Sequence, residues 1–97
     1  MNDLICRAIR EQRLLELHYH GYMRRVAPHV YGIDGKGDEM LSCYQIWGGS
    51  ESGEEAGWKS FKVLAITELK LTTRRFGPRP EYRHGDPALK QIFCQIG

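Results

Sequence analysis

The chain has 97 residues, of which 41% are hydrophobic and 27% charged, and its formal net charge at pH 7 is +2. This length suits one domain and excludes a second folding unit, and apolar residues that recur along the whole chain exclude intrinsic disorder. No stretch approaches the roughly 18 apolar residues of a membrane-spanning helix, and the polar N-terminus MNDLICRAIREQ does not resemble a signal peptide.

The first twelve residues have the spacing of a short amphipathic helix. The apolar side chains that share one face of such a helix are Leu4, Ile5, Ala8 and Ile9. Either Asn2 or Asp3 can cap it by accepting a hydrogen bond from a free backbone N–H of the first turn. The sequence therefore predicts a helix at about residues 3–12.

Beyond this helix the apolar period changes from 3.6 to 2, which is typical of half-buried β-strands. Residues 15–20 alternate apolar and polar side chains, and Gly21 marks a tight turn into a second strand at residues 23–33. Because Pro28 lacks a backbone N–H, we expect the second strand to lie at a sheet edge or to bend there.

The rest of the chain predicts a mainly β domain. The further elements are, in order, a hairpin turn at Asp34-Gly35-Lys36-Gly37, a third strand at 38–47, a polar glycine-rich loop at 48–57, a fourth strand at 58–62, a single helical turn at 63–66 and a fifth strand at 67–73. Asp86-Pro87 has the pattern of a helix start, so a short C-terminal helix is expected after it. The layout predicts one domain over residues 1–97: a small five-stranded barrel at about 13–75 and a C-terminal tail at about 76–97.

The three cysteines, Cys6, Cys43 and Cys94, are odd in number and widely spaced, with no C-x-x-C pair. This pattern argues against a disulfide framework. Cys6 and Cys43 lie in apolar stretches and are interpreted as small buried hydrophobic residues. Unpaired cysteines in turn predict a reducing, cytoplasmic compartment.

Charge is unevenly distributed along the chain. Residues 74–84 hold four arginines and one glutamate, whereas residues 51–55 hold three glutamates and no cation. In the basic segment, cations alternate with aromatic rings, as in surfaces that bind single-stranded nucleic acid. The candidate nucleic-acid contacts are Arg74, Arg75, Arg79, Tyr82 and Arg83. The alternative is that Phe76 and Tyr82 pin the tail to the barrel while the arginines extend into water.

Several short segments occur in an order that carries a family resemblance. They are Arg7-Ala8-Ile9 followed by Leu15-Glu16-Leu17-His18-Tyr19, then Arg24-Arg25-Val26-Ala27-Pro28, Leu41 with Tyr44, Lys59-Ser60-Phe61-Lys62-Val63 with Ile66, and Phe76 through Tyr82. In this order they resemble the WYL domain, a module found mostly in bacterial transcription regulators. The chain differs from the family pattern in having Glu39-Met40-Leu41 in place of the naming tripeptide, and Lys59 and Ala65 in place of arginines.

The resemblance implies an Sm-like barrel whose groove binds a small effector or single-stranded nucleic acid. By their positions in the family pattern, the first ligand-binding candidates are Tyr19, Arg24 and Lys59, because cations can converge on a phosphate and a ring can stack on a base. Arg25 and His29 are further candidates. The alternative is that Tyr19 belongs to the core, Arg24 and Lys59 are ordinary surface charges, and His29 is an exposed histidine.

The sequence predicts no enzyme, no metal site and no cofactor. His18 and His20 share one side of a strand with Glu16, which falls short of the four ligands of a structural zinc site. Cys43 lies in an apolar strand where burial keeps a thiol inert, and no base is placed near it. The predicted function is therefore a regulatory, ligand-sensing domain whose partner is a nucleotide or single-stranded nucleic acid. The alternative is a protein-interaction or oligomer-forming module without a small ligand.

Overall fold

The computed structural model describes residues 1–51, 53 and 56–97, so Glu54 and Glu55 of the acidic segment lie outside the described residues, as does Ser52 of the glycine-rich loop. The elements in chain order are α1 (Asp3–Glu11), β1 (Arg13–Tyr19), β2 (Tyr22–Asp34), β3 (Glu39–Gly48), β4 (Gly57–Lys62), the 3-10 turn η1 (Val63–Ala65), β5 (Ile66–Arg75) and β6 (Leu89–Gln95). The N-terminal helix and the first five strands are confirmed, with bounds close to those that the sequence predicts.

The N-terminal helix α1 begins at a side-chain cap. The Oδ1 atom of Asn2 accepts a hydrogen bond from the backbone N–H of Ile5 at 3.1 Å, which satisfies one free donor of the first turn. The helix ends at Glu11 and is followed by the C-cap residue Gln12, which has a left-handed φ of 50°. Its apolar stripe faces the core of the domain. Within the described residues, no helical segment has the length and hydropathy of a membrane span.

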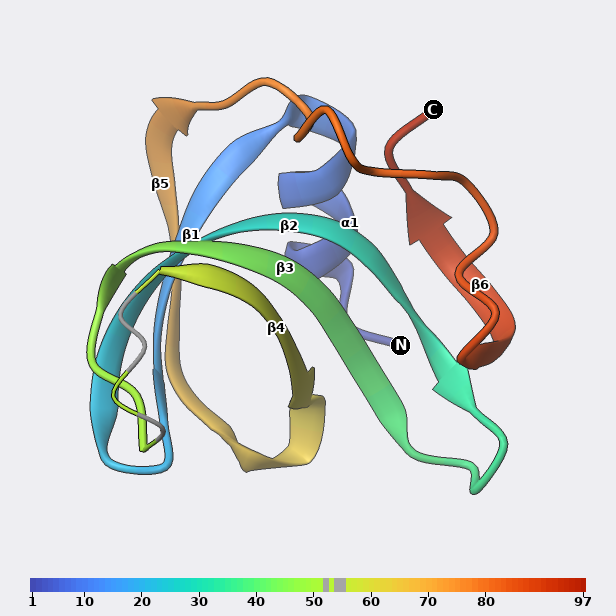
Figure 1. Ribbon diagram of the computed structural model, residues 1–97, viewed down its shortest axis with the longest axis horizontal. Coiled ribbons are helices and arrows are strands. Elements are labelled where there is room, and N and C mark those ends of the chain that lie inside the picture. Colours follow the sequence, from blue (N-terminus) through green and yellow to red (C-terminus); the bar gives the residue numbers. More distant parts are fainter. Residues whose placement is uncertain (52, 54–55) are drawn as a thin grey trace.

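The six strands form one antiparallel sheet in the order β4–β3–β2–β1–β5, with β6 added beside β2. The sheet is strongly curved, so its strands wrap around the interior of the domain (Figure 1). In the described residues β4 and β5 remain the two ends of the strand order, joined by η1, and the sheet is therefore open. The prediction of a five-stranded barrel is thus met only in part, because the sheet has a sixth strand and does not close.

Strand β2 has 13 residues and is irregular at Pro28. It pairs with β1 up to Val26 and with β6 from Val30 onward. Pro28 lies between these two partners and is paired with neither, and the register with β3 shifts between Pro28 and Val30. The expected bend at Pro28 is present, although β2 lies in the middle of the sheet and not at its edge.

The C-terminal segment forms a strand, and the prediction of a short helix there is wrong. Residues Leu89–Gln95 are β6, which pairs with the second half of β2. Asp86 begins a tight turn: its Oδ1 accepts the N–H of Ala88 at 2.9 Å, and its carbonyl oxygen accepts the N–H of Leu89 at 3.1 Å. Because β1 leaves this part of β2 without a partner, ladder hydrogen bonds to β6 override the local helix signal.

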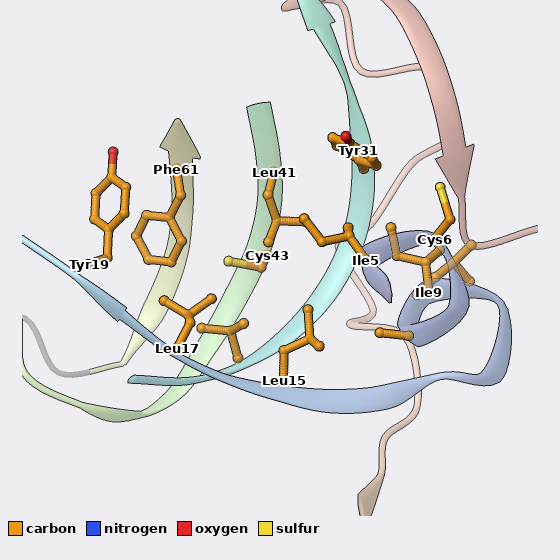
Figure 2. Packing of buried hydrophobic residues seen from close by; sticks show 13 residues of the cluster. Ile5, Cys6, Ile9, Leu15, Leu17, Tyr19, Tyr31, Leu41, Cys43 and Phe61 are labelled. Atoms are coloured by element: carbon orange, nitrogen blue, oxygen red, sulfur yellow. The ribbon is translucent and has the colours of Figure 1, made fainter. Parts of the chain in front are cut away.

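The hydrophobic core is a continuous row between α1 and the concave face of the sheet (Figure 2). Alternate residues of β1, β3 and β4 point into it, as the period-2 pattern of the sequence predicts. Ile5 and Ile9 of α1 lie at one end of the row. At the other end the rings of Tyr19 and Phe61 pack with their centroids 4.3 Å apart.

Cys6 of α1 and Cys94 of β6 form a disulfide, with their Cα atoms 5.7 Å apart. The prediction that the cysteines are unpaired is therefore wrong, because the fold brings together two residues that are 88 positions apart in sequence. Of the three cysteines, Cys43 alone is free, and it is buried. The inference of a reducing, cytoplasmic compartment loses its basis, since it depended on unpaired cysteines.

We expect protein that is purified without reductant and then denatured to contain one titratable thiol per chain, that of Cys43. Replacing both partners, as Cys6→Ser with Cys94→Ser, should lower the free energy of unfolding by roughly 2–5 kcal/mol, because the bond closes a long loop in the unfolded chain. Urea unfolding with and without reductant measures the loss, and the double variant is the control, since reductant should not shift its midpoint. A wild-type midpoint that reductant leaves unchanged would contradict the bond.

Candidate anion-binding site

The cations Arg24 and Lys59 point to the same face of the sheet, although they come from β2 and β4. In the sheet register Leu17 lies opposite Arg24, and Cys43 lies opposite Lys59. Residues that lie opposite each other in an antiparallel pair point to the same face. Because Leu17 and Cys43 belong to the core, both cations point toward the concave interior.

Both cations act on the ionisation of Cys43. Burial raises the pKa of this thiol above its ordinary value, and the positive charges of Arg24 and Lys59 lower it by less. Since the effect of a charge on a neighbouring pKa is strongest at short range, the two cations lie close to the same point of the interior. The thiol itself stays protonated and unreactive at neutral pH.

Arg24 is buried, with 3% of its surface exposed. Its Nη2 donates to the backbone carbonyl oxygen of Tyr19 at 3.0 Å, and its Nη1 donates to Oε1 of Gln45 at 3.4 Å. Its Cζ lies 5.4, 5.6 and 5.1 Å from the ring centroids of Tyr19, Tyr22 and Phe61. Aromatic faces attract a cation, so these rings stabilise the guanidinium. The interpretation of Arg24 as an ordinary surface charge is wrong.

The positive charge of Arg24 has no carboxylate partner in the described part of the chain. Its Nε is also buried, and no described residue forms a hydrogen bond with it. Buried charges in proteins are normally paired, because removing an ion from water costs several kcal/mol. A buried arginine in this state is therefore a candidate for binding an anion that supplies the missing partner.

Tyr19 belongs to the core and is 8% exposed. Its hydroxyl oxygen accepts a hydrogen bond from the backbone N–H of Lys62 at 3.1 Å, and its ring lies against the guanidinium of Arg24. In this arrangement Tyr19 supports Arg24 from the interior and does not present a free face for a base to stack on.

The segment that follows β3 connects the two sides of the site. Lys59 is half-buried, and its Nζ donates to Oγ of Ser50 at 3.3 Å. The Nε2 atom of the buried Gln45 donates to the carbonyl oxygens of Gly48 and Gly49 at 3.1 and 3.2 Å. Since Gln45 also accepts from Arg24, one short segment is hydrogen-bonded to the surroundings of both cations.

Gln45 is a site residue that the sequence interpretation missed. It follows Leu41 and Cys43 at intervals of two, so it occupies the buried face of the same strand. A long polar side chain in an alternation of buried apolar residues needs hydrogen-bond partners inside the fold. The position of Gln45 in this alternation is the sequence signal that could have identified it as a site residue.

Arg25 lies on the convex face of the sheet, away from Arg24. It forms an ion pair with Glu16, in which Nη2 and Nε lie 2.7 and 3.1 Å from Oε2. Its Cζ is 5.7 Å from the ring centroid of Trp47. The structure therefore does not bring Arg25 together with the other ligand candidates.

His29 is fully buried, with 0% of its surface exposed, so its interpretation as an exposed histidine is wrong. Its ring is surrounded by Trp58, Phe76 and Tyr82, at centroid distances of 4.8, 5.4 and 5.2 Å. Trp58 lies opposite Tyr44 on the outer side of the sheet. His29 is thus a buried residue beneath the tail and does not reach the concave face of Arg24.

Arg79 and Arg83 of the basic segment make contacts within the protein. Arg79 lies 3.3 Å from the carboxylate of Glu81, and its Cζ lies 4.0 Å from the ring centroid of Tyr44. The Nη1 of Arg83 donates to the backbone carbonyl oxygens of Pro80 and Tyr82, at 3.1 and 2.9 Å. These contacts occupy part of the hydrogen-bonding capacity that a nucleic-acid backbone would use.

The other candidates of the basic segment are half-buried or exposed. The hydroxyl of Tyr82 donates to the carbonyl oxygen of Ile96 at 2.9 Å, which pins the tail to the end of β6. Arg74 and Arg75 are exposed at the end of β5, where Arg75 donates to the carbonyl oxygen of Glu11 at 3.0 Å. The alternative interpretation, in which aromatic residues pin the tail while arginines reach solvent, describes this arrangement better.

No three His, Cys, Asp or Glu side chains of the described residues are grouped as metal ligands would be. Nδ1 of His18 contacts the carboxylate of Glu68, and Nδ1 of His20 lies 2.8 Å from Oε1 of Glu51. Each of the two histidines therefore faces one carboxylate of its own.

An exposed apolar groove of about 320 Å³ lies at the end of β3, and the sequence interpretation did not predict it. Its lining residues are Met23, Ile46, Trp47, Gly48, Gly49 and Ala56. Met23, Ile46 and Trp47 are 41%, 45% and 56% exposed. Apolar residues at these exposures form a hydrophobic surface beside the segment that Gln45 holds.

Comparisons with known proteins do not assign the chain to a family. No protein-family model matches its sequence, and neither the curated proteins nor the solved structures contain a match. The resemblance to the WYL domain therefore depends on the segments named above, and function has to be inferred from the geometry.

Replacing Arg24 by methionine, which fills similar space without the charge, should not destabilise the domain. The free energy of unfolding should stay within about 1 kcal/mol of wild type or rise, because the variant loses two hydrogen bonds but buries no unpaired cation. Phe61→Ala, at the neighbouring ring, is the control for lost packing and should cost about 3–5 kcal/mol. Urea unfolding measures both variants. A loss above about 3 kcal/mol in Arg24→Met would instead assign the guanidinium a structural role.

Proposed function

We propose that this chain is a regulatory binding domain of the WYL type. Its ligand is anionic, a nucleotide or single-stranded nucleic acid, which Lys59 contacts and Arg24 attracts. Occupancy by the ligand changes how the domain meets a regulatory protein partner. The proposal assigns no catalytic step, metal or cofactor to the domain.

The observation that carries the proposal is the buried guanidinium of Arg24, which has no ion pair among the described residues and has an unpartnered Nε. A charge acts more strongly in the protein interior than in water, because little solvent screens it. Arg24 therefore maintains a positive potential on the concave face. An anion bound there is stabilised by that potential and relieves the cost of the buried charge.

Lys59 is the more accessible cation of the pair, since it is half-buried whereas Arg24 is buried. A lysine ammonium contacts a phosphate as a point charge, whereas an arginine can offer two parallel N–H donors. In this arrangement Lys59 makes contact with the ligand, and the buried Arg24 supplies a fixed positive charge that attracts it. The lysine occupies the position at which the family pattern has an arginine.

Three features of the fold support placing the domain among the Sm-like barrels of that family. The sheet is strongly curved, α1 closes one end of the core row, and the short turn η1 links the end strands β4 and β5. A curved sheet of this kind offers a concave face in which side chains from several strands converge.

Binding assays with labelled single-stranded oligonucleotides and with common nucleotides test the proposal. We expect saturable binding at about 50 mM salt that weakens as salt rises, because phosphate contacts release counterions. Lys59→Gln should raise the dissociation constant about tenfold, the loss expected for one charge-assisted hydrogen bond. Arg24→Met should abolish saturable binding.

The matched control is Lys36→Gln, which removes one lysine charge from the exposed turn between β2 and β3, at the other end of these strands from Arg24. It should bind as wild type does. Equal affinities of the Lys59→Gln and Lys36→Gln variants would show that any binding follows net charge and not this site. Absence of saturable binding at about 50 mM salt would reject the proposed ligand class.

A protein-interaction or oligomer-forming role is the second candidate, and the exposed groove around Trp47 favours it. If the groove mediates self-association, light scattering should give a dimer or larger assembly that Trp47→Ser converts to the monomer. Leu64→Ser is the control, because Leu64 is 97% exposed but does not line the groove. A monomeric mass for wild type at all concentrations would exclude self-association through this surface.

A further inference from the structure

The tail segment Phe76–Tyr82 packs on the convex face of the sheet, in the connection between β5 and β6 (orange in Figure 1). The guanidinium of Arg79 lies over the ring of Tyr44, at 4.0 Å from the centroid. The indole N–H of Trp58 donates to the Glu81 carboxylate at 3.0 Å. Tyr44 and Trp58 lie opposite each other in β3 and β4, so the segment covers the outer surface of these two strands.

His29 lies beneath this segment, and its two hydrogen bonds require a neutral imidazole. Nδ1 lies 2.8 Å from the carbonyl oxygen of Ala27, which can only accept, so Nδ1 carries the proton. Nε2 lies 3.1 Å from the backbone N of Arg79, which can only donate, so Nε2 carries none. A second proton, on Nε2, would place two donors against each other at the point where the tail segment meets the sheet.

The groups that face His29 do little to stabilise the positive charge of its protonated form. Burial lowers the pKa of His29, the hydrogen bond to Ala27 and the carboxylate of Glu81 raise it by less, and the guanidinium of Arg79 lowers it further. The rings that contact His29, those of Trp58 and Phe76 and the phenol of Tyr82, carry no charge. The lowered pKa of His29 and its two hydrogen bonds therefore favour the same neutral form of the imidazole.

We propose that His29 makes the tail segment Phe76–Tyr82 a pH-sensitive latch, docked on the convex face while the imidazole is neutral and released when Nε2 takes up a proton. Release breaks the bond to the Arg79 N–H and increases the exposure of the aromatic side chains of Tyr44 and Trp58. It also frees Arg79 from its contact with the sheet. The latch is independent of the anion site, because it lies on the opposite face.

The direction of the pH effect follows from the protons bound in each state. Because the docked segment lowers the pKa of His29, the released state binds more protons, and release becomes easier as pH falls. The change begins below about pH 6.5, the ordinary pKa of histidine. The equilibrium constant for release then rises by up to about tenfold for each pH unit, until the pKa of the docked state is reached. Above this range the segment stays docked.

Hydrogen exchange of the Arg79 amide, measured by NMR between about pH 7.5 and pH 5.5 in the intact disulfide-bonded chain, tests the latch. Exchange rates are corrected for the intrinsic pH dependence to give protection factors. We expect the protection of Arg79 to fall by up to about tenfold for the pH unit below 6.5. Amides of the β1–β2 ladder should keep their protection, because the release is local.

His29→Gln separates titration from structure, since a glutamine oxygen can still accept the Arg79 N–H but cannot take up a proton in this range. It should remove the pH dependence of Arg79 protection. His84→Gln makes the same substitution at an exposed histidine after the segment and should leave the dependence unchanged. The latch is overturned if wild-type protection does not change with pH, if His29→Gln retains the wild-type dependence, or if the β1–β2 amides lose protection in parallel with Arg79.

Discussion

Strand β2 pairs with β3 on one side, and on the other side with β1 before Pro28 and with β6 after it. Proline has no N–H for a ladder, so the strand bends at the one place where a partner is missing on that side. Before the bend, Arg24 points into the concave interior. After the bend, His29 lies among the aromatic residues of the convex face. A single strand therefore supplies a buried arginine to one face of the sheet and a buried histidine to the other.

These two side chains respond differently to the same condition, which is burial away from water. Histidine can lose its proton near neutral pH, so His29 becomes a neutral residue with both ring nitrogens hydrogen-bonded. Arginine keeps its proton at any physiological pH, so Arg24 remains a buried cation. Aromatic faces and two carbonyl-type acceptors stabilise that cation without neutralising it. The concave face thus keeps a positive charge, and the convex face acquires a group that can become charged.

The C-terminal part of the chain completes the domain in three ways. Strand β6 pairs with the half of β2 that β1 leaves open, and the disulfide from Cys94 to Cys6 joins this strand to α1. Ile96 accepts from the Tyr82 hydroxyl, and its own N–H donates to the carbonyl oxygen of His29. The tail therefore belongs to the folded unit, and the contacts around His29 depend on it.

The local pattern of the sequence was sufficient to predict α1 with a cap at Asn2 or Asp3, the first five strands and the hairpin turn at Asp34, because these depend on periodicity and turn chemistry within a few residues. The family resemblance singled out Arg24 as a ligand candidate, but the sequence did not indicate that its guanidinium is buried. The tertiary structure alone decided that residues 89–95 form a strand, that Cys6 meets Cys94, and that His29 is covered. Each of these outcomes depends on which distant segment packs against the residue, and ladder hydrogen bonds, a covalent bond and burial between remote segments leave no periodic trace in the chain.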